Sequence, residues 1–380
     1  MIEFKLPSLG ADMDEGKLLE WLVKPGDEVK RGQVVAIVDT SKTAVDVEIW
    51  QAGRVHELIV QPGEQIPVGT LLATLLEPGE SAPPPRPAPA VGAIKPEARR
   101  RVSPAARREA ETLGVDISLL AGSGPDGSVT LEDVRQAAVA KSATPPAAPV
   151  PAKPAATPDR NAEMRKAIAA AMSRSKREIP HYYLSETIPL RRASDWLARQ
   201  NAQRPVTERL LMATLQLKAV ALATRKFPEM NGFWQDNTFK SAPAAHIGVA
   251  IALRQGGLLA PAIHDVAEKT LDRLMIDLTD LVKRVRAGTL RSSEMSDPTL
   301  TVTNLGDQGV DAVFGVIYPP QVALVGFGKV LQRPWAEGGE VRSMPTVVAS
   351  LAADHRVSDG HRGALFLAEI EELLQHPEQL

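Results

Sequence analysis

The stretch "VKPGDEVKRGQVVAIV" (residues 23–38) has a second copy in the N-terminal region of this 380-residue chain. It aligns without gaps on "VQPGEQIPVGTLLATL" (residues 60–75). In both copies Pro-Gly and a second glycine mark turns, and alternating apolar residues mark strands. An internal repeat of this kind indicates two matching structural halves. We therefore predict that residues 1–77 form a flattened, pseudo-symmetric all-β barrel or sandwich.

A single lysine, Lys42, follows the first copy of the repeat in "VDTSKTAVDVE" (residues 38–48). Small polar residues surround it and separate two strand-like runs, which is typical of a hairpin turn. A surface lysine needs no special role. Its place between the two halves of the repeat nevertheless favours one.

This arrangement resembles the lipoyl and biotinyl carrier domains, in which a lysine at a hairpin bears the cofactor. Biotinyl domains usually flank that lysine with methionines, whereas Ser41 and Thr43 flank Lys42. The lipoyl type therefore fits better. The resemblance implies lipoate amide-linked to Lys42, which makes a flexible arm with a dithiolane at its end.

Two proline- and alanine-rich stretches, residues 78–98 and 139–159, divide the chain. Neither contains the large apolar residues that a core requires, and such segments favour extended conformations. We predict that both are linkers. Three folded domains are then expected, at residues 1–77, 99–138 and 160–380.

Residues 99–138 carry a basic cluster and two signals for the start of a helix. Ser103-Pro104 is a typical pair for the N-cap and first helical position, and "TLED" (residues 130–133) is a capping-box pattern. Such a short helical unit buries little surface and suits docking better than catalysis. It resembles the peripheral-subunit-binding domain of 2-oxo acid dehydrogenase complexes, which binds the 2-oxo acid decarboxylase or dihydrolipoamide dehydrogenase through a basic face. The residues that the resemblance assigns to this face are Arg100, Arg101, Arg107 and Arg108.

Helical and strand patterns are mixed from residue 160 onward, which predicts an α/β domain with a substantial sheet. Helices are expected within residues 160–178, 208–227 and 270–288. Strands are expected after Pro180 and within residues 244–253, 299–306, 321–330 and 345–355.

The segment "ADHRVSDGHRG" (residues 353–363) places His355 directly after an apolar strand. An imidazole titrates near neutral pH and can act as a base there. "HRVSDG" resembles the HxxxDG motif of dihydrolipoamide acyltransferases, whose catalytic domain is chloramphenicol-acetyltransferase-like. "TVTNLGDQGV" (residues 301–310) resembles the strand that carries this family's Ser or Thr hydroxyl. The resemblance implies His355 as general base, Thr303 as hydrogen-bond donor to an oxyanion, and Asp359 orienting the motif through an ion pair.

The resemblance covers nearly the whole chain in the family's domain order. It implies transfer of an acyl group from lipoyl-lysine to coenzyme A without an acyl-enzyme. "IPHYYLSETI" (residues 179–188) looks more like acetyl-transferring members, which favours a pyruvate dehydrogenase-type complex. Homotrimers are also implied, with His and hydroxyl from different subunits, assembling into a core of 24 or 60 chains. His264 stands where many relatives have a basic residue.

Composition excludes several classes of function. The chain has no cysteine, which excludes disulfides, thiolate metal sites and a cysteine nucleophile, and we predict no metal site. A net charge of -2 does not favour nucleic acid as a partner. No stretch resembles a signal peptide or a membrane span, so a cytoplasmic protein without a membrane partner is expected.

Two alternatives to the enzyme remain. One is a biotin carrier, which needs neither the basic module nor a large third domain. The other is a non-catalytic, lipoyl-bearing subunit-binding protein of such a complex. Proteins of that kind typically lack the catalytic histidine, so the intact "HRVSDG" argues against it.

Overall fold

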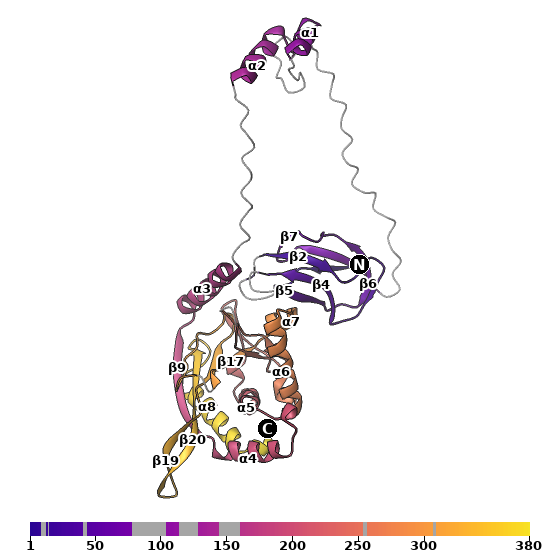
Figure 1. Cartoon of the computed structure of the whole chain (residues 1–380). Coiled ribbons are helices and arrows are strands. Elements are labelled where there is room, and N and C mark those ends of the chain that lie inside the picture. The colour runs from indigo at the N-terminus through magenta and orange to yellow at the C-terminus, as the bar shows by residue number, and fades with distance from the viewer. Residues whose placement is uncertain are drawn as a thin grey trace. The chain divides into compact units, whose positions relative to one another are not determined.

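The computed structural model describes residues 1–8, 13, 15–40, 44–77, 104–113, 128–143, 160–253, 257–306 and 309–380. The chain forms two compact units, one from Met1–Ser81 with Pro158–Leu380 and the other from Ala82–Thr157. The first unit contains an all-β part and an α/β part (Figure 1). Among the described residues, no helix has the length and hydrophobicity needed to cross a bilayer.

The all-β part has two sheets that repeat the same strand order. One sheet has the order β1-β8-β6-β3, and in the other β5, β4, β2 and β7 are neighbours in that order. The repeat aligns β2 with β6 and β4 with β8. Each half thus gives its long strands to one sheet and its short strand, β3 or β7, to the other, which confirms the predicted pseudo-symmetric β fold. The strands are β1 (Ile2–Lys5), β2 (Glu15–Trp21), β3 (Glu28–Val29), β4 (Gln33–Asp39), β5 (Ala44–Ile49), β6 (Gly53–Leu58), β7 (Gln65–Pro67) and β8 (Leu71–Leu76).

Matched turns occur at equivalent places in the two halves. Gly26 and Gly63, from the two Pro-Gly pairs, have φ values of 98° and 97°. This region of φ favours glycine because glycine has no Cβ. Asp27 Oδ2 accepts a hydrogen bond from Lys24 N at 2.8 Å, and Glu64 caps the second turn in the same way. The repeat in sequence is therefore a repeat in turn chemistry as well.

Strands β4 and β5 form the hairpin that flanks Lys42. They are antiparallel, and the last pair in register is Asp39 opposite Ala44. Val38 and Val45, the next pair inward, are fully buried, so the core ends one pair before the end of the strands. Lys42 itself lies outside the described residues.

The described residues of the second unit form the helices α1 (Pro104–Leu113) and α2 (Leu131–Ala143). A reciprocal cap precedes α2, as "TLED" predicts. Asp133 N donates to Thr130 Oγ1 at 3.4 Å, and Thr130 N donates to Asp133 Oδ2 at 2.9 Å. The buried hydrophobic cluster of its described residues consists of Ala106, Ala110, Val129 and Val134. A core this small suits a docking module.

The α/β part is built on a mixed sheet, as expected. Within the described ranges this sheet has seven strands, in the order β15-β12-β17-β18-β20-β19, with β9 also paired to β20. β12, β17 and β18 are parallel, whereas β20 is antiparallel to β18 and to β9. β20 is 15 residues long, so its first half pairs with β19 and its second half lies between β18 and β9.

The strands of this sheet are β9 (His181–Pro189), β12 (Ile247–Val249), β15 (Ala262–Ile263), β17 (Leu300–Asn304), β18 (Ala323–Phe327), β19 (Leu331–Glu337) and β20 (Glu340–Asp354). The helices are α3 (Arg160–Glu178), α4 (Arg191–Ala202), α5 (Met212–Lys226), α6 (Leu271–Ala287), α7 (Ser292–Ser296) and α8 (Gly360–Gln375). Shorter strands are β10 (Gly232–Gln235), β11 (Thr238–Ser241), β13 (Ile251–Ala252), β14 (Leu258–Leu259) and β16 (Leu290–Arg291).

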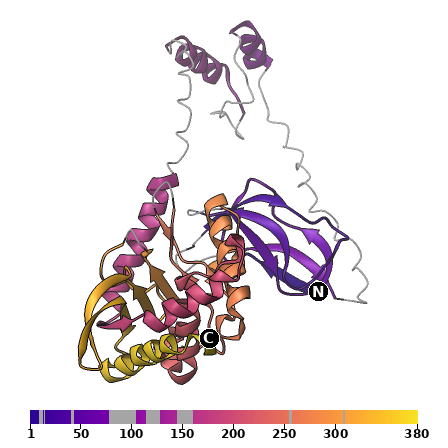
Figure 2. The same cartoon turned by 60° about the horizontal axis from the view of Figure 1, so that its bottom comes forward.

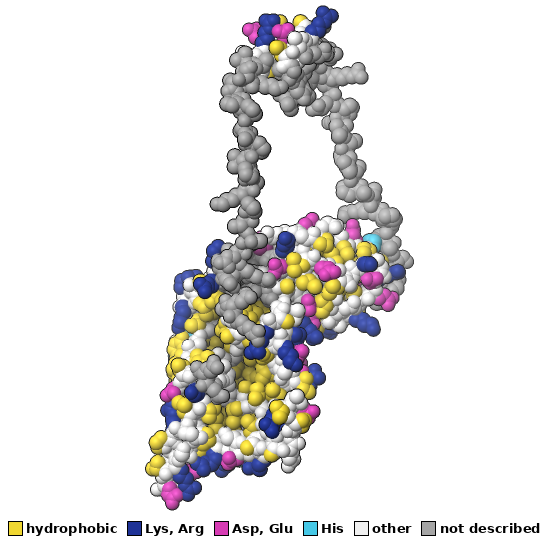
Figure 3. All heavy atoms as spheres, viewed as in Figure 1, with side chains coloured by type: hydrophobic (Ala, Val, Ile, Leu, Met, Phe, Trp, Pro, Cys, Tyr) yellow, Lys and Arg dark blue, Asp and Glu magenta, His cyan; other side chains and the backbone are white. Residues whose placement is uncertain are grey.

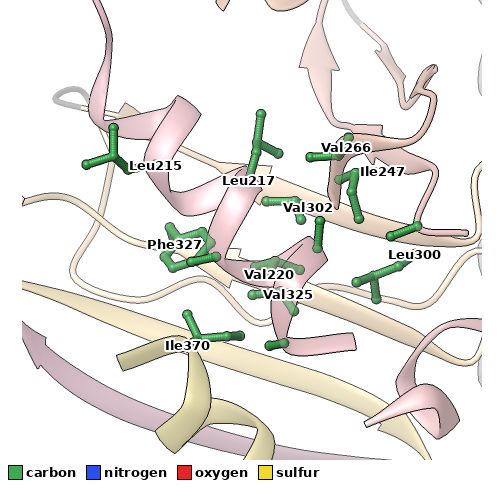
Figure 4. Packing of buried hydrophobic residues seen from close by; sticks show 14 of the residues in the cluster. Leu215, Leu217, Val220, Ile247, Val266, Leu300, Val302, Val325, Phe327 and Ile370 are labelled. Carbon is green, nitrogen blue, oxygen red and sulfur yellow. The ribbon is translucent and has the colours of Figure 1, made fainter. Parts of the chain in front are cut away.

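Helices α5 and α8 contact each other and the sheet (Figures 1 and 2). Figure 4 shows Leu217 and Val220 of α5 close to Val302 of β17 and Val325 of β18, with Ile370 of α8 nearby. All five side chains are buried. This core fixes the carboxyl ends of β17 and β20, where Thr303 and His355 lie.

Candidate active site

His355 lies directly after the last residue of β20, in the turn that leads to α8. Its backbone N donates to Pro180 O at 2.9 Å. Val357 N and Ser358 N both donate to Asp354 O, at 3.0 and 3.1 Å, and close the turn. The His355 side chain is exposed in the single chain, as a base that must reach a substrate proton requires.

Asp354 and Arg356, the two neighbours of His355, form an ion pair in which Asp354 is buried and Arg356 is exposed. The Asp354 carboxylate accepts hydrogen bonds from Arg356 Nε at 2.9 and 3.1 Å and from Nη2 at 2.6 Å, and Asp354 is fully buried. The guanidinium also lies 4.6 Å from the centroid of the Trp234 ring, within cation–π range. Removing the Arg356 guanidinium would leave the Asp354 carboxylate buried without its cation, which destabilises the turn. The pair therefore holds the backbone on both sides of His355.

Asp359 acts as a helix cap where an ion pair was expected. Its Oδ1 accepts a hydrogen bond from Arg362 N at 2.9 Å, which makes it the N-cap of α8. That hydrogen bond is the largest cause of the lowered pKa of the Asp359 carboxyl. In the part of the chain that the structure describes, Asp359 makes no ion pair, and the guanidinium of Arg356 is bound by Asp354. Within the described part of the single chain, the ion pair beside His355 is made by Asp354, which the sequence did not single out.

Tyr182 packs against His355 from the neighbouring strand β9, where it is paired with Ala353. The centroids of the two rings are 5.1 Å apart and the ring planes meet at 63°, an edge-to-face contact. The Tyr182 hydroxyl lies 2.8 Å from Ser358 Oγ. Neither Tyr182 nor Ser358 was predicted from sequence, since only strand register brings them together.

His181, the first residue of β9, anchors the segment that accepts the hydrogen bond from His355 N. Its Nδ1 lies 2.8 Å from Ile179 O, and Ile317 N donates to its Nε2 at 3.2 Å. This pattern requires a neutral imidazole with the proton on Nδ1. Burial lowers the pKa of His181, so the neutral form is favoured.

A cavity of about 490 Å³ lies beside His355. Both arginines in its wall have an acidic partner, since Arg356 pairs with Asp354 and Arg362 pairs with Glu229. A cavity whose cations are already neutralised suits a neutral group better than a carboxylate. Its lining consists of Glu229, His355, Arg356, Val357, Ser358, Asp359 and Arg362.

Thr303 is half-buried near the end of β17 and stands opposite Gly326 of β18. Among the described residues its hydroxyl has no hydrogen-bond partner, so it can donate to a ligand. Gly326 cannot easily be replaced, because a Cβ there would lie 2.5 Å from Val313 O and 2.6 Å from Ser350 Oγ. This close packing fixes the strand beside Thr303.

Thr303 and His355 lie at opposite ends of the sheet. Gly326, the partner of Thr303, is paired in turn with Ser350 of β20, and His355 follows Ser350 by five positions. At about 3.3 Å per residue and 4.8 Å between strands, the two residues are roughly 16 Å apart along the strands and about 10 Å across them. The fold therefore does not bring the predicted base and hydroxyl together within one chain.

The predicted docking arginines are only partly described. Arg108 is exposed on α1, and Arg107 lies on the same helix with its side chain outside the described set. Arg100 and Arg101 lie outside the described residues, as Lys42 does.

His264 is paired with an acid. Its Nε2 lies 2.9 Å from Asp297 Oδ2, and its ring packs edge-on against His246 with centroids 5.0 Å apart. These side chains do not form a metal site, since the described residues contain no group of three or more His, Cys, Asp or Glu that could hold a metal ion.

Three family models match the chain in order. Residues 2–75 match the model described as biotin-requiring enzyme, and residues 100–135 match the e3 binding domain. Residues 155–380 match the 2-oxoacid dehydrogenases acyltransferase (catalytic domain), which spans more than half of the chain. The chain belongs to this acyltransferase family.

Relatives of this acyltransferase match it from end to end. The dihydrolipoyllysine-residue acetyltransferase component of the pyruvate dehydrogenase complex of Rhizobium meliloti is 31% identical, over 99% of this chain and 98% of its own length. The same component of Staphylococcus aureus is 28% identical, over 100% and 98%. The acetyltransferase component of the acetoin cleaving system of Bacillus subtilis is 28% identical, over 100% and 99%.

Solved structures match a little over half of the acyltransferase chain. A probable dihydrolipoamide acetyltransferase from Listeria monocytogenes has a TM-score of 0.53 and 27% identity, and covers 56% of this chain and 92% of its own. The cubic core of a pyruvate dehydrogenase multienzyme complex has a TM-score of 0.53 and 26% identity, and covers 56% and 88%.

Membership of the acyltransferase family confirms the main expectations. The protein is an enzyme, its N-terminal domain is of the type that carries covalent lipoate, and coenzyme A is the substrate of its catalytic domain. The hairpin of β4 and β5 fits such a carrier, because the buried core ends at Val38 and Val45 before the strands do. The multidomain fold is confirmed, and the matches to the e3 binding domain and to the acyltransferase catalytic domain favour the enzyme over a biotin carrier or a non-catalytic binding protein.

Proposed function

We propose that this enzyme transfers acetyl groups from lipoyl-lysine at Lys42 to coenzyme A, within a pyruvate dehydrogenase-type complex of the cytoplasm. The observation that carries the proposal is the placement of His355, exposed at a cavity and held between the two members of the Asp354–Arg356 pair. The functions of the relatives named above support the acetyl group and the complex.

The chemistry needs one base and one hydrogen-bond donor. Bound at Lys42, lipoate would supply the acyl group as a thioester on a mobile arm. His355 takes the proton from the thiol of coenzyme A and returns it to the sulfur that leaves the acyl group. A thiol is mostly protonated at pH 7, so a positioned base of this kind contributes about 10²- to 10⁴-fold in rate. Thr303 donates a hydrogen bond to the carbonyl oxygen as negative charge develops there.

The acyl group is tested by comparing donors. Arg356 and Arg362 are both paired with acids, so among the described residues the cavity offers no unpaired arginine. The free carboxylate at the far end of a succinyl group would therefore lack a cationic partner there. We expect kcat/KM for acetyl-dihydrolipoamide to exceed that for succinyl-dihydrolipoamide by about tenfold or more, the worth of roughly 1.4 kcal/mol. Equal values for the two donors, measured as acyl-coenzyme A formed, would refute the acetyl assignment.

The two halves of the site are proposed to come from neighbouring subunits of a homotrimer. The separation of Thr303 from His355 within one chain supports this arrangement. Exposed hydrophobic side chains on the α/β part, among them Val206, Val310 and Phe314, support a protein contact as well. Figure 3 shows such apolar areas between the charged groups of this part.

Thr303 allows a paired test of the donor role. Thr303→Ala should lower kcat by about 10² or more, because one oxyanion donor is typically worth 10²- to 10³-fold. Thr303→Ser keeps the hydroxyl and should stay within a few-fold of the natural enzyme. The measurement is steady-state acetyl transfer to coenzyme A, with particle size checked for each variant. A Ser variant as slow as the Ala variant would contradict the donor role as the cause of the loss, because the hydroxyl alone would then not preserve turnover.

We propose the domain limits expected from sequence, 1–77, 99–138 and 160–380, joined by linkers at 78–98 and 139–159. The middle domain would dock the decarboxylase or dihydrolipoamide dehydrogenase through Arg100, Arg101, Arg107 and Arg108. Binding by such a face should weaken as salt rises, since exposed charges are screened beyond about 8 Å at physiological ionic strength. Capture of the dehydrogenase that is insensitive to salt would contradict it.

A further inference from the structure

Tyr182 contacts both His355 and Ser358, and the proposed chemistry gives neither Tyr182 nor Ser358 a role. The Tyr182 ring meets the imidazole edge-on with centroids 5.1 Å apart, while its hydroxyl lies 2.8 Å from Ser358 Oγ. One side chain from β9 thus touches the turn of residues 355–358 at both its first and its last position.

Strand register and close packing fix the position of Tyr182 in this contact. Register pairs Tyr182 with Ala353, two residues before His355. Gly363 in the first turn of α8 leaves room for the hydroxyl, because a Cβ there would lie 2.9 Å from Tyr182 Oη. Burial raises the pKa of the Tyr182 phenol, so it stays a neutral hydrogen-bonding group.

The opposite side of the turn is already fixed by the Asp354–Arg356 pair, which holds backbone and leaves the imidazole free to rotate. No hydrogen bond joins the His355 ring to another described residue. Contact with the edge of a neighbouring ring is therefore the restraint on its orientation that the structure provides. Correct orientation of a reacting group is a large part of an enzyme's advantage, and small displacements reduce rates.

We propose that Tyr182, locked by its hydrogen bond to Ser358, orients the His355 imidazole for proton transfer, so that both are positioning residues. The proposal rests on the function proposed for His355. It predicts that loss of the hydroxyl pair changes turnover and leaves substrate binding unchanged.

The experiment is a double-mutant cycle on the full-length protein in its assembled form. Tyr182→Phe keeps the ring and removes the hydroxyl, and Ser358→Ala removes its partner. Each should lower kcat by about 3- to 10-fold, the usual worth of one neutral hydrogen bond, with KM for coenzyme A unchanged. Because both remove the same interaction, the double variant should be no slower than the slower single variant.

Two further variants separate positioning from general damage. Tyr183→Phe is the matched control, since Tyr183 is the next residue of β9 and its hydroxyl contacts Lys176 instead. It should keep the natural kcat. Adding Tyr182→Phe to a His355→Ala protein should cause no further loss, because the tyrosine acts only through the imidazole.

The outcomes are distinct. Natural kcat in Tyr182→Phe, a loss that multiplies in the double variant, or a loss confined to KM would each overturn the positioning role. Near-natural activity of His355→Ala alone would instead overturn the proposed function. Unchanged particle size and melting temperature would exclude misfolding as the cause of any loss.

Discussion

Turnover should fall by about 10² to 10⁴ when His355 is replaced by alanine, the usual worth of a general base. The loss should appear in kcat and in kcat/KM to a similar extent, because a base acts mainly in the transition state. Alanine at this position removes the ring but not the backbone bond from residue 355 N to Pro180 O, nor the Asp354–Arg356 pair. The turn should therefore keep its shape. The measurement is steady-state formation of acetyl-coenzyme A from acetyl-dihydrolipoamide.

His361 provides the control for this variant. It lies in the first turn of α8, is exposed, and does not line the cavity beside His355. His361→Ala should keep near-natural turnover, and particle size should be the same for both proteins. If a correctly assembled His355→Ala protein still transferred acetyl groups at a near-natural rate, His355 would not be the base.

Flux through the assembled complex should be abolished when Lys42 is replaced by arginine. Arginine keeps the positive charge of the hairpin but cannot form the amide that holds lipoate. The same variant should still transfer acetyl groups from free acetyl-dihydrolipoamide, because the free substrate replaces the attached arm. Overall flux is measured as NADH formed from pyruvate, and transfer is measured separately with the free substrate.

Intact mass gives an independent check on Lys42. The natural protein should carry the mass of a lipoyl group, and the Lys42→Arg protein should not. Lys24→Arg is the control, since Lys24 is exposed at a turn of the same all-β part. A lipoyl adduct that survives in Lys42→Arg would place the attachment site elsewhere.

The fold was predictable where a pattern is repeated or long. Two aligned copies with equivalent Pro-Gly turns indicate the all-β part. Helices α3, α5 and α6 coincide with long helical patterns. Helix α4 was not predicted. It is a short, polar segment whose N-cap, Leu190, makes no side-chain cap, so no local signal marks its start. β19 was also missed, because its exposed residues alternate with half-buried ones and the core does not require them.

Candidates for the site could be named from sequence where a motif lies in consecutive residues. "HRVSDG" and "TVTNLG" are local motifs, so His355 and Thr303 could be named from them. The contacts that support His355 could not be predicted from local motifs, for two different reasons. Asp354 and Arg356 are adjacent in sequence, but their pairing depends on the burial of Asp354 at the end of β20. Tyr182 reaches Ser358 only through the register of β9 against β20, a relation that periodicity does not encode.

The separation of Thr303 and His355 along the sheet links enzyme activity to protein concentration. If His355 is the base and Thr303 the donor, as proposed, a single chain holds two incomplete sites, and neither can complete the other. Specific activity then becomes a function of subunit concentration and should decline on dilution as the assembly dissociates. A newly synthesised chain that has not yet assembled would be unable to transfer acyl groups. Catalysis would therefore begin only after subunits associate.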